Sequence, residues 1–329
     1  MNRKLILFGA GNTAKRILEA ELCDIKVAYI CDNDIKKWNT QFSADSRTFT
    51  IYPPDKLMEE DPNKIIVMIT SIATVSIYYQ LKNMGIINCF TWFRYVSKNN
   101  LSKLEKNADK IEMVSDLLAD DHSRKIYSRV ISFRVADEID YSEINENNQY
   151  FVNDIFPLSD SEVFVDAGAL EGDTIEGFLR STGGNFKKIY SFEPNKKCFD
   201  ILKNKFNSDK IVLYPYAVYN ESVELRFDGN QIASGGEEII KTLRIDDAIN
   251  DDVTFIKMDV EGAELKALYG AENIIKKCLP KLAICLYHKL EDLWEIPLLI
   301  NKWCPEYKLY IRHHSHVYYE TVLYAILKA

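Results

Sequence analysis

The sequence predicts an α/β protein with two doubly wound parallel sheets, the second of which ends in an antiparallel hairpin. Short apolar runs alternate with helix-periodic segments in two series, over about 4–93 and from about 161 onward. Such alternation is typical of parallel sheets. The chain of 329 residues is long for one core, since a domain averages roughly 150 residues. The last two β-rich runs, "YKLYIRH" and "ETVLYAIL", are joined by a short polar turn, which indicates a hairpin.

The first series predicts a domain over residues 1–97. A helix is expected from about Thr13 to Leu22, and the expected strands are "KLILFG", "KVAYICD", "KIIVMIT" and "INCFTW". The start has a basic tip, but its apolar run stops at Gly9 and is too short for the core of a signal peptide. We therefore interpret it as the first strand. The polar, helix-periodic residues 98–150 are expected to form a helical connector.

The second series predicts a domain over residues 151–329. Helices are expected over 174–181, 195–206 and 263–277. The expected strands between them are "EVFVDAG", "KIYSFEP", "IVLYPYAV", "TFIKMD" and "KLAICLYH", with a less regular stretch after the third. The closing hairpin makes this sheet mixed at one edge.

Composition limits the partners and the compartment. Apolar residues make up 47% of the sequence and charged residues 27%, as in an ordinary soluble globular protein. The net charge of −8 disfavours nucleic acid and anionic membranes, since both would repel the chain. No apolar stretch reaches the roughly 18 residues of a membrane helix. The seven cysteines are scattered without a C-x-x-C pair, which suggests reduced thiols and a cytoplasmic protein.

The first glycine loop, "GAGNTA", has the pattern of a dinucleotide-binding turn. Gly9 allows a tight turn, Gly11 allows close approach of a pyrophosphate, and Asp32 follows the next strand, where it could accept hydrogen bonds from a ribose. Such loops also occur in domains that bind nothing, and about 100 residues are few for a complete dinucleotide fold. Two interpretations stay open: a site for a nucleotide or nucleotide sugar, and a structural turn.

The second glycine loop, "VFVDAGALEGDT", carries acids that change the ligand it favours. Asp166 ends the strand, Gly168 lets the backbone approach a ligand, and Gly172 precedes a helix whose first N–H groups Asp173 or Thr174 could cap. Asp166 and Asp173 would repel a pyrophosphate but attract a sulfonium ligand that carries an ammonium group. The loop therefore favours S-adenosylmethionine over a dinucleotide.

Further polar residues follow the later strands, at the edge where doubly wound folds bind ligands. Glu193 is placed to accept hydrogen bonds from both ribose hydroxyls of an adenosine. The stretch "FIKMDVEGAE" delivers Asp259 and Glu261, whereas Glu264 is interpreted as an acid favoured by the dipole of the next helix. His288 ends the strand "LAICLYH" beside these carboxylates. It is the first candidate for a general base and Asp259 the second, although a lone histidine is often structural.

A divalent metal is a further hypothesis, because Asp259, Glu261 and His288 could hold one that lowers the pKa of a substrate hydroxyl. A second group of basic residues, expected in the turn of the last hairpin, comprises Arg312, His313, His314 and His316. A metal in that turn is disfavoured, because no acid or cysteine matches its spacing. Arg312 and His313 are instead candidates, with Glu261, for substrate binding.

Residues from about 115 to 329 resemble the FkbM family of S-adenosylmethionine-dependent methyltransferases. The D-V-E-G-A-E stretch is the most specific piece. The matching stretches are "VFVDAGALEGDTIEGF", "YSFEPN", "TLRIDD", "FIKMDVEGAELKALYGA", "YHKLEDLWEIP" and "RHHSHVYYETVLYAI". The segment before them, with "QYFVNDIF", is similar to the subgroup that has a preceding Rossmann-like domain. The closing antiparallel hairpin agrees with a methyltransferase fold, since a dinucleotide-binding domain more often ends in parallel strands.

The resemblance implies a small Rossmann-like domain followed by a class I methyltransferase fold. It also implies methyl transfer from S-adenosylmethionine to a hydroxyl, commonly in the building of glycans or antibiotics. By position, Asp259 and His288 would face the transferred methyl and Glu193 would bind the ribose. The residues that would line the rest of the cofactor are Asp166, Gly168, Ala169, Gly172, Asp173 and Thr174. The loop departs from the glycine-richer family pattern at Ala169 and Leu170.

Two other functions stay open on the sequence alone. One is a nucleotide-sugar binding module that keeps the fold without the chemistry. The other is an NAD-dependent sugar-modifying enzyme that acts through "GAGNTA". The expected partners are a small-molecule or glycan hydroxyl substrate, a nucleotide sugar at the N-terminal domain, and a second copy of the chain in a homo-oligomer.

Overall fold

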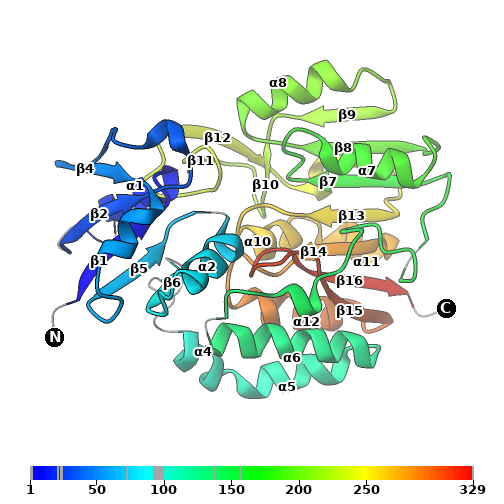
Figure 1. The fold of residues 1–329 in the computed structure, drawn as a ribbon. Helices are drawn as coiled ribbons and strands as arrows, with labels where there is room; N and C mark the ends of the chain where they lie inside the picture. Colours follow the sequence, from blue (N-terminus) through cyan, green and yellow to red (C-terminus); the bar gives the residue numbers. More distant parts are fainter. Residues whose placement is uncertain are drawn as a thin grey trace. The chain divides into compact units, whose positions relative to one another are not determined.

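The computed structural model describes residues 3–20, 22, 25–71, 73–91, 100–136, 138–155 and 157–327. The chain divides into two compact units, Met1–Lys103 with Phe133–Tyr141 and Leu104–Ser132 with Ser142–Ala329. We call them unit 1 and unit 2 and describe each by itself (Figure 1). Within the described residues, none of the helices combines the length and the apolar character that crossing a bilayer requires.

Unit 1 contains a six-stranded sheet with the order β3-β4-β2-β1-β5-β6. Its strands are β1 (Lys4–Phe8), β2 (Val27–Cys31), β3 (Gln41–Ala44), β4 (Arg47–Tyr52), β5 (Ile65–Ile69) and β6 (Cys89–Thr91). Neighbouring strands are parallel except β3 and β4. Helix α1 (Asn12–Ala20) follows β1 and α2 (Thr74–Asn83) follows β5. The predicted parallel strands are confirmed, although Trp92 at the end of the last one lies outside the described residues.

The hairpin β3–β4 was not predicted. Its strands alternate exposed and buried residues over only four and six positions, and Asp45 in the turn has a φ of +55°. Because the hairpin covers the sheet edge with polar side chains, it lacks the continuous apolar run that marks a buried strand.

In the range predicted as a connector, the described residues form the helices α4 (Asn100–Lys106), α5 (Ala108–Leu117) and α6 (Asp121–Ala136). The last three residues of α4, all of α5 and the larger part of α6 belong to unit 2. The one-turn 3-10 helix at Ser142–Ile144 follows them.

Unit 2 contains a seven-stranded sheet with the order β15-β16-β14-β13-β7-β8-β9. Its strands are β7 (Val163–Ala167), β8 (Lys188–Phe192), β9 (Ile211–Tyr214), β13 (Phe255–Met258), β14 (Lys281–Cys285), β15 (Tyr307–His313) and β16 (Thr321–Leu327). Strand β16 lies between β14 and β15 and is antiparallel to both, whereas β7, β8, β9, β13 and β14 are parallel. The predicted doubly wound sheet with a closing antiparallel hairpin is therefore confirmed.

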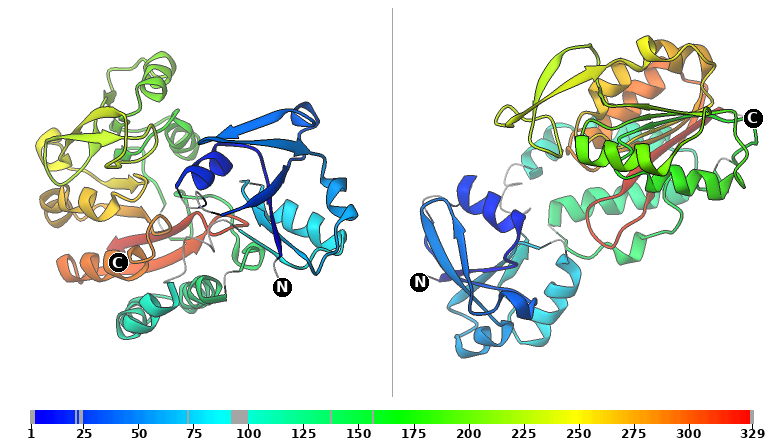
Figure 2. Two further views of the ribbon diagram at one scale, coloured as in Figure 1. Left: turned by 90° about the vertical axis from the view of Figure 1, so that its left-hand side faces the viewer. Right: turned by 90° about the horizontal axis from the view of Figure 1, so that it is seen from above.

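Helices cover both faces of this sheet. Figure 2 shows α7 (green) on one face and α11 and α12 (orange) on the other. The helices of unit 2 that follow the sheet strands are α7 (Asp173–Ser181), α8 (Lys196–Lys205), α9 (Ile245–Ala248), α10 (Glu264–Tyr269), α11 (Glu272–Cys278) and α12 (Asp292–Trp303). The prediction of a single helix over 263–277 is wrong. This segment forms two helices that divide at Gly270, where a Cβ would lie 2.0 Å from the Tyr219 carbonyl oxygen. The chain bends there because two backbone segments meet.

The core of unit 2 explains why its central strands read as nearly continuous apolar runs. All residues of β7 and β13 are buried. The Phe164 ring stacks on Phe178 of α7 at 4.5 Å and on Phe255 of β13 at 4.8 Å between centroids. A strand buried on both faces loses the alternation of a surface strand, and the charged residue in each of these two strands pairs with the other.

A second, three-stranded sheet in unit 2 was not predicted. It consists of β10 (Ala217–Val218), β12 (Glu238–Leu243) and β11 (Glu224–Phe227), with β12 in the middle. Its small core contains Ala217, Phe227 and Ile240. Strands β11 and β12 fall in the stretch that the sequence marked only as irregular, whereas the strand expected over "IVLYPYAV" divides into β9 and β10.

Candidate functional site

A pocket lies at the carboxyl ends of β7, β8 and β13, with about 710 Å³ of empty space that is partly open to solvent. Four predicted site residues line it: Gly168, Glu193, Asp259 and Glu261. The other lining residues are Leu170, Phe192, Pro194, Asn195, Ala217, Val218, Phe227, Gly229, Asn230, Gln231, Ile232, Val260 and Ala263.

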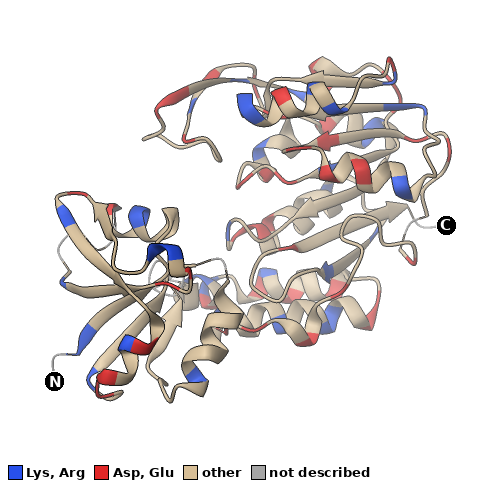
Figure 3. Cartoon of the chain, turned by 45° about the horizontal axis from the view of Figure 1, so that its top comes forward, with Lys and Arg blue, Asp and Glu red and all other residues tan. Residues whose placement is uncertain are grey.

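The charge of this pocket comes from the few residues that line it. Acidic and basic residues are interspersed over each unit (Figure 3). Among the described residues that line the pocket, Glu193, Asp259 and Glu261 are acids and none is Lys or Arg. The pocket is therefore suited to a ligand with positive charge and hydroxyl groups.

Gly168 joins two strand ends. Its φ is +83°, and a Cβ there would lie 1.8 Å from the carbonyl oxygen of Asp259. The amides of Gly168 and Ala169 both donate to the Phe192 carbonyl, at 3.0 and 3.1 Å. No larger residue fits, so Gly168 is needed for the close approach of β7 and β13.

The start of α7 differs from the prediction. Gly172, with a φ of +88°, holds the N-cap position, and no side chain caps the helix. The expectation that Asp173 or Thr174 caps it is wrong, because both already lie in the first turn and Thr174 is buried. A Cβ at Gly172 would lie 2.4 Å from the Phe206 ring, so this glycine allows α7 to pack beside α8.

Asp166 was predicted to line the pocket, but it does not. It is completely buried, and its Oδ1 lies 3.1 Å from Nζ of Lys257. Burial raises the pKa of Asp166 to about 6, against the lowering effect of the Lys257 charge. Lys257 also donates to the Gly168 carbonyl at 2.7 Å. Asp166 therefore acts through Lys257 on the glycine loop. A lysine inside the apolar run "FIKMD" was the sequence signal for this pair.

Glu193 lies where the sequence predicted it and is almost fully buried. Its Oε2 accepts from the Leu170 amide at 2.8 Å and its Oε1 from the Asn195 amide at 2.7 Å. Burial raises the pKa of Glu193 although both hydrogen bonds lower it. Each carboxylate oxygen has a second lone pair. Glu193 can thus hold its own loop and still accept from a ribose diol.

Asp259 is held by two tyrosines. Its Oδ2 accepts from the Tyr150 hydroxyl at 2.8 Å and its Oδ1 from the Tyr287 hydroxyl at 3.1 Å. Burial would raise the pKa of Asp259, but the charges of Lys257 and His288 and the two hydroxyls leave it below its ordinary value. Asp259 is therefore an oriented anion. The sequence carried no signal for Tyr150, which comes from a segment 109 residues away.

His288 lies among three carboxylates. Its Nδ1 is 2.8 Å from Oε1 of Glu264, and its Nε2 is 3.4 Å from Oε2 of Glu261 and 3.5 Å from Oδ1 of Asp259. Burial lowers the pKa of His288, but the hydrogen bonds and charges of these acids raise it to about 11. The ring holds a proton at neutral pH, so the geometry is against the general-base role predicted for it.

Glu264 has more than the helix-dipole role predicted for it. It is completely buried, and its Oε1 accepts from the Val260 amide at 2.9 Å. It therefore orients His288 and the loop after β13.

The metal hypothesis does not fit this donor set well. Among the described residues, the groups whose ligand atoms lie within 4.8 Å of one another are Asp259, Glu264 and His288, and Asp259, Cys285 and Glu320, so the predicted ligand Glu261 belongs to neither. A histidine binds a metal only as a neutral ring. The carboxylates stabilise the protonated ring instead.

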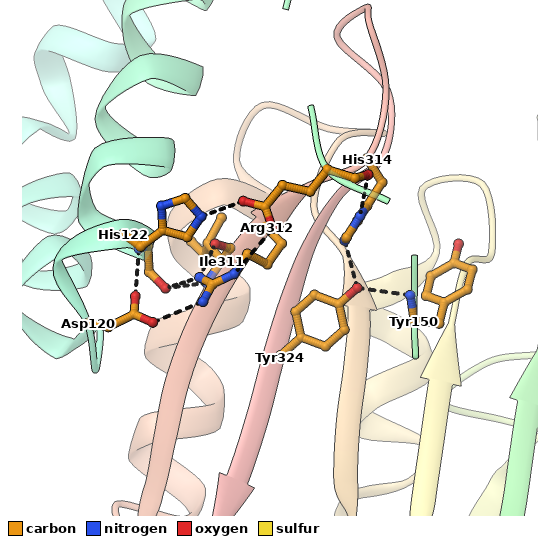
Figure 4. A network of polar contacts seen from close by, with 9 residues as sticks. Asp120, His122, Tyr150, Ile311, Arg312, His314 and Tyr324 are labelled. Carbon is orange, nitrogen blue, oxygen red and sulfur yellow. Dashed lines mark hydrogen bonds and ion pairs between the residues drawn. The ribbon is translucent and has the colours of Figure 1, made fainter. Parts of the chain in front are cut away.

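Arg312 and His313 were predicted to bind substrate, but the structure does not place them for this role. They lie on β15 instead of in the turn, and both are buried. Arg312 Nη2 donates to Asp120 at 2.9 Å and Nη1 donates to the Ser123 hydroxyl at 2.7 Å. His313 lies 2.9 Å from the Thr321 hydroxyl. Arg312 thus fixes the last hairpin to the helices before the sheet (Figure 4), whereas His313 holds the two strands of the hairpin together.

The same network holds the segment that carries Tyr150. His314 Nδ1 donates to the Glu146 carbonyl at 3.1 Å, and its Nε2 accepts from the Tyr324 hydroxyl at 2.8 Å. The Tyr324 oxygen accepts from the Tyr150 amide at 2.9 Å (Figure 4). Burial lowers the pKa of His314 to about 4, which agrees with a neutral ring that both donates and accepts. Tyr150 itself has a φ of +66°, and these bonds offset that strain.

Unit 1 has a pocket of its own beside the first glycine loop, with about 770 Å³ of space, lined among others by Gly9, Gly11, Asp32 and Lys37. It lies at the carboxyl ends of β1 and β5, where the strand order reverses. Asp32 accepts from the Ala10 amide at 2.7 Å and from Lys37 Nζ at 2.9 Å. Burial would raise the pKa of Asp32, but these hydrogen bonds lower it.

The two glycines of this loop differ. A Cβ at Gly9, where φ is +115°, would lie 2.8 Å from the carbonyl oxygen of Thr70. A Cβ at Gly11 would meet no atom within 4 Å, and its φ is not in the left-handed region. Gly9 is therefore needed by the fold, whereas Gly11 keeps open the space above the loop.

Comparison with known proteins finds a similar domain and a similar fold. Residues 166–314 match the family model of the methyltransferase FkbM domain. The crystal structure of the methyltransferase FkbM from Methylobacillus flagellatus KT is similar over 98% of this chain and 89% of its own, with 24% identity and a TM-score of 0.79. At this identity the likeness shows the fold. No curated protein matches the sequence.

Two other solved structures resemble parts of the chain more distantly. An rRNA methylase from Streptococcus thermophilus covers 52% of this chain and 89% of its own, with 15% identity and a TM-score of 0.36. Aeropyrum pernix fibrillarin, in complex with natively bound S-adenosyl-L-methionine, covers 51% and 67%, with 10% identity and a TM-score of 0.34. Residues 166–314 are thus similar to the methyltransferase FkbM domain, and the chain shares its fold with an FkbM methyltransferase over 98% of its length.

Proposed function

We propose that this chain transfers a methyl group from S-adenosylmethionine to a hydroxyl of a sugar, a glycan or a related small molecule. The observation that carries the proposal is the charge of the unit 2 pocket. Three acids and no Lys or Arg are found among its described lining residues. A dinucleotide brings a pyrophosphate that these acids would repel, whereas a sulfonium ligand with an ammonium group is attracted.

The residues of this pocket fit the cofactor. Glu193 would hold the ribose hydroxyls, and the backbone of Gly168–Leu170 would lie along the methionine part. Apolar side chains on the adenosine side include Phe192 and Ile232. When bound, S-adenosylmethionine supplies an electrophilic methyl group on a positively charged sulfur.

Asp259, and not His288, is the residue suited to receive a hydroxyl. It is an anion oriented by Tyr150 and Tyr287, whereas His288 already holds its proton. The low pKa of Asp259 makes it a weak base. Base catalysis typically contributes about 100- to 10,000-fold. Holding the reacting atoms in line can supply roughly 7–11 kcal/mol, so positioning is the larger contribution.

Calorimetry with S-adenosylmethionine tests the cofactor. We expect micromolar binding to the wild-type chain and a loss of about tenfold or more in Glu193→Gln, because a hydrogen bond to a charged group is worth about 1.5–3 kcal/mol. Asp252→Asn is the control, since this acid is exposed and pairs with Lys277. No binding at millimolar ligand would instead favour a module without the chemistry.

The acceptor needs a separate experiment. S-adenosylmethionine with a ¹³C-labelled methyl group is incubated with a panel of sugars and sugar derivatives, and the ¹³C chemical shift of the product shows which atom was methylated. An O-methyl signal supports the proposal. A methyl on nitrogen or carbon would contradict the oxygen specificity while leaving the methyltransferase activity intact.

The pocket of unit 1 supports a second proposal, that it binds a nucleotide or a nucleotide sugar. The open space above Gly11 favours it, because no contact in unit 1 requires glycine there. Lys37 supplies a cation that the unit 2 pocket lacks. The test uses UDP and UDP-glucose as probes. Binding that disappears in Gly11→Val at unchanged Tm supports the site, and binding that survives the substitution contradicts it.

A further inference from the structure

The loop between β11 and β12 forms one wall of the unit 2 pocket. Four of its residues, 229–232, line the pocket. Asp228 shapes the loop, because its Oδ1 accepts from the amides of Asn230 at 3.0 Å and Gln231 at 2.9 Å. The Asp228 amide in turn donates to the Gln231 carbonyl at 3.1 Å. The tip is therefore a preformed turn.

The base of this loop belongs to the small sheet and not to the seven-stranded one. Phe227 is buried against Ala217 and Ile240, and Ile232 packs on them. A Cβ at Gly236 would lie 2.4 Å from the backbone of Phe227, so the two ends of the loop are pressed together. The loop thus projects from a separate anchor, where Phe227 and Ile232 pair across the turn, and a contact at its tip adds to the hold against the pocket.

Asn195 provides such a contact. Its Nδ2 donates to the Gly229 carbonyl at 2.7 Å. Its Oδ1 caps helix α8 by accepting from the amides of Lys197 at 2.9 Å and Cys198 at 3.3 Å. The two ends of this side chain cannot be exchanged, because the oxygen would then face a carbonyl and the NH₂ would face amides. The backbone N–H of Asn195 also donates to the Glu193 carboxylate at 2.7 Å. One residue therefore links the carboxylate proposed to bind the ribose to the 228–232 loop.

We propose that Asn195 is a positioning residue for the cofactor pocket. Its side-chain amide holds the tip of the 228–232 loop against the pocket and slows the release of the bound cofactor product. The inference rests on the proposed S-adenosylmethionine site. It assigns the β11–β12 loop as a wall whose hold on the pocket limits how fast S-adenosylhomocysteine leaves.

Two substitutions separate this role from helix capping. Asn195→Ser keeps a good N-cap, since serine and asparagine cap about equally well, but it removes the donor to Gly229. Asn195→Ala removes both. Dissociation of S-adenosylhomocysteine is measured by stopped-flow displacement. We expect it to be about threefold to tenfold faster in both variants, the effect of losing one neutral hydrogen bond, with association unchanged. Only Asn195→Ala should lower Tm.

Hydrogen exchange without ligand gives a second readout. The amides of residues 228–232 should exchange faster in Asn195→Ser than in the wild-type chain, while those of α8 stay protected. Wild-type release rates or unchanged exchange in Asn195→Ser would overturn the inference. Failure of the wild-type chain to bind S-adenosylhomocysteine would overturn the proposed function and the claim about release with it. The exchange comparison would still decide whether Asn195 holds the loop.

Discussion

Replacing Lys257 with methionine should destabilise unit 2 more than any loss of surface charge. Lys257 Nζ is 3.1 Å from Oδ1 of Asp166, and the side chains are only 2% and 0% exposed. The same ammonium donates to the Gly168 carbonyl and lies 5.2 Å from the centre of the Tyr150 ring. Methionine has a similar length and fills the space, so the substitution removes the charge and leaves little cavity.

The magnitude follows from the carboxylate that is left behind. Asp166 cannot reach water, and breaking a buried ion pair by removing one partner typically costs about 3–5 kcal/mol. The double variant Lys257→Met/Asp166→Asn should recover much of this loss, because no uncompensated charge remains. Lys277→Met is the matched control. Lys277 and its partner Asp252 are 69% and 79% exposed, and its loss should not be measurable.

The destabilisation should depend on pH. The pKa of Asp166 in the folded chain, about 6, lies above the ordinary value of 3.8, so the folded state binds this proton more tightly than the unfolded state. Protonation of Asp166 therefore favours folding below about pH 4, and this contribution fades as the pH rises through 6. Loss of Lys257 raises the pKa of Asp166 further. The cost of Lys257→Met should be larger at pH 8 than at pH 5.

Urea unfolding at pH 5 and pH 8 measures the effect, with the transition of unit 2 identified by hydrogen exchange of the β7 and β13 amides. A loss below about 1 kcal/mol at pH 8 would refute the reasoning, because it would place the pair in the range of surface ion pairs. An equal loss of stability at pH 5 and pH 8 would refute the argument that protonation of Asp166 makes the cost depend on pH.

Three further substitutions test other parts of the structure. Gly168→Ala should prevent stable folding of unit 2, because its Cβ would lie 1.8 Å from the Asp259 carbonyl oxygen; Gly11→Ala, which meets no atom, should leave Tm unchanged. His288→Gln should lower Tm most at or below pH 6.5. The reason is that the pKa of His288 is raised in the folded state, so its protonation stabilises the fold most below the ordinary pKa of 6.5. The difference in Tm between this variant and the wild-type chain should vanish as the pH approaches 11. Arg312→Met should lower stability by about 1.5–3 kcal/mol in urea but leave the affinity for S-adenosylmethionine within twofold, since Arg312 touches no residue of the pocket. A tenfold loss of affinity would contradict a purely structural role of Arg312.

Much of the fold could be predicted because its signals are local. Apolar runs marked the buried strands, helical periodicity marked α1, α7 and α8, and a polar turn between two β-rich runs marked the last hairpin. Residues that follow parallel strands meet at one edge of the sheet. For this reason Gly168, Glu193 and Asp259 could be assigned to one site before the structure was known.

The same local reasoning failed where a neighbour far along the chain decides the outcome. The helix expected over 263–277 is divided because Gly270 meets the backbone of Tyr219. The weak strands of the small sheet show no pattern of their own and exist only because β12 pairs with both β10 and β11. Arg312 and His313 are polar and sit near a turn, yet the sheet buries them.

The sequence by itself determined which residues reach the carboxyl edge of the sheet, because strand period and strand end are properties of short segments. Only the tertiary structure decided what those residues can do. Asp166 was expected to face the ligand, but packing turned it toward Lys257. His288 was expected to accept a proton, but Glu261 and Glu264 hold one on it. Protonation and orientation depend on burial and on charges within a few ångströms, and those neighbours come together only when the chain folds.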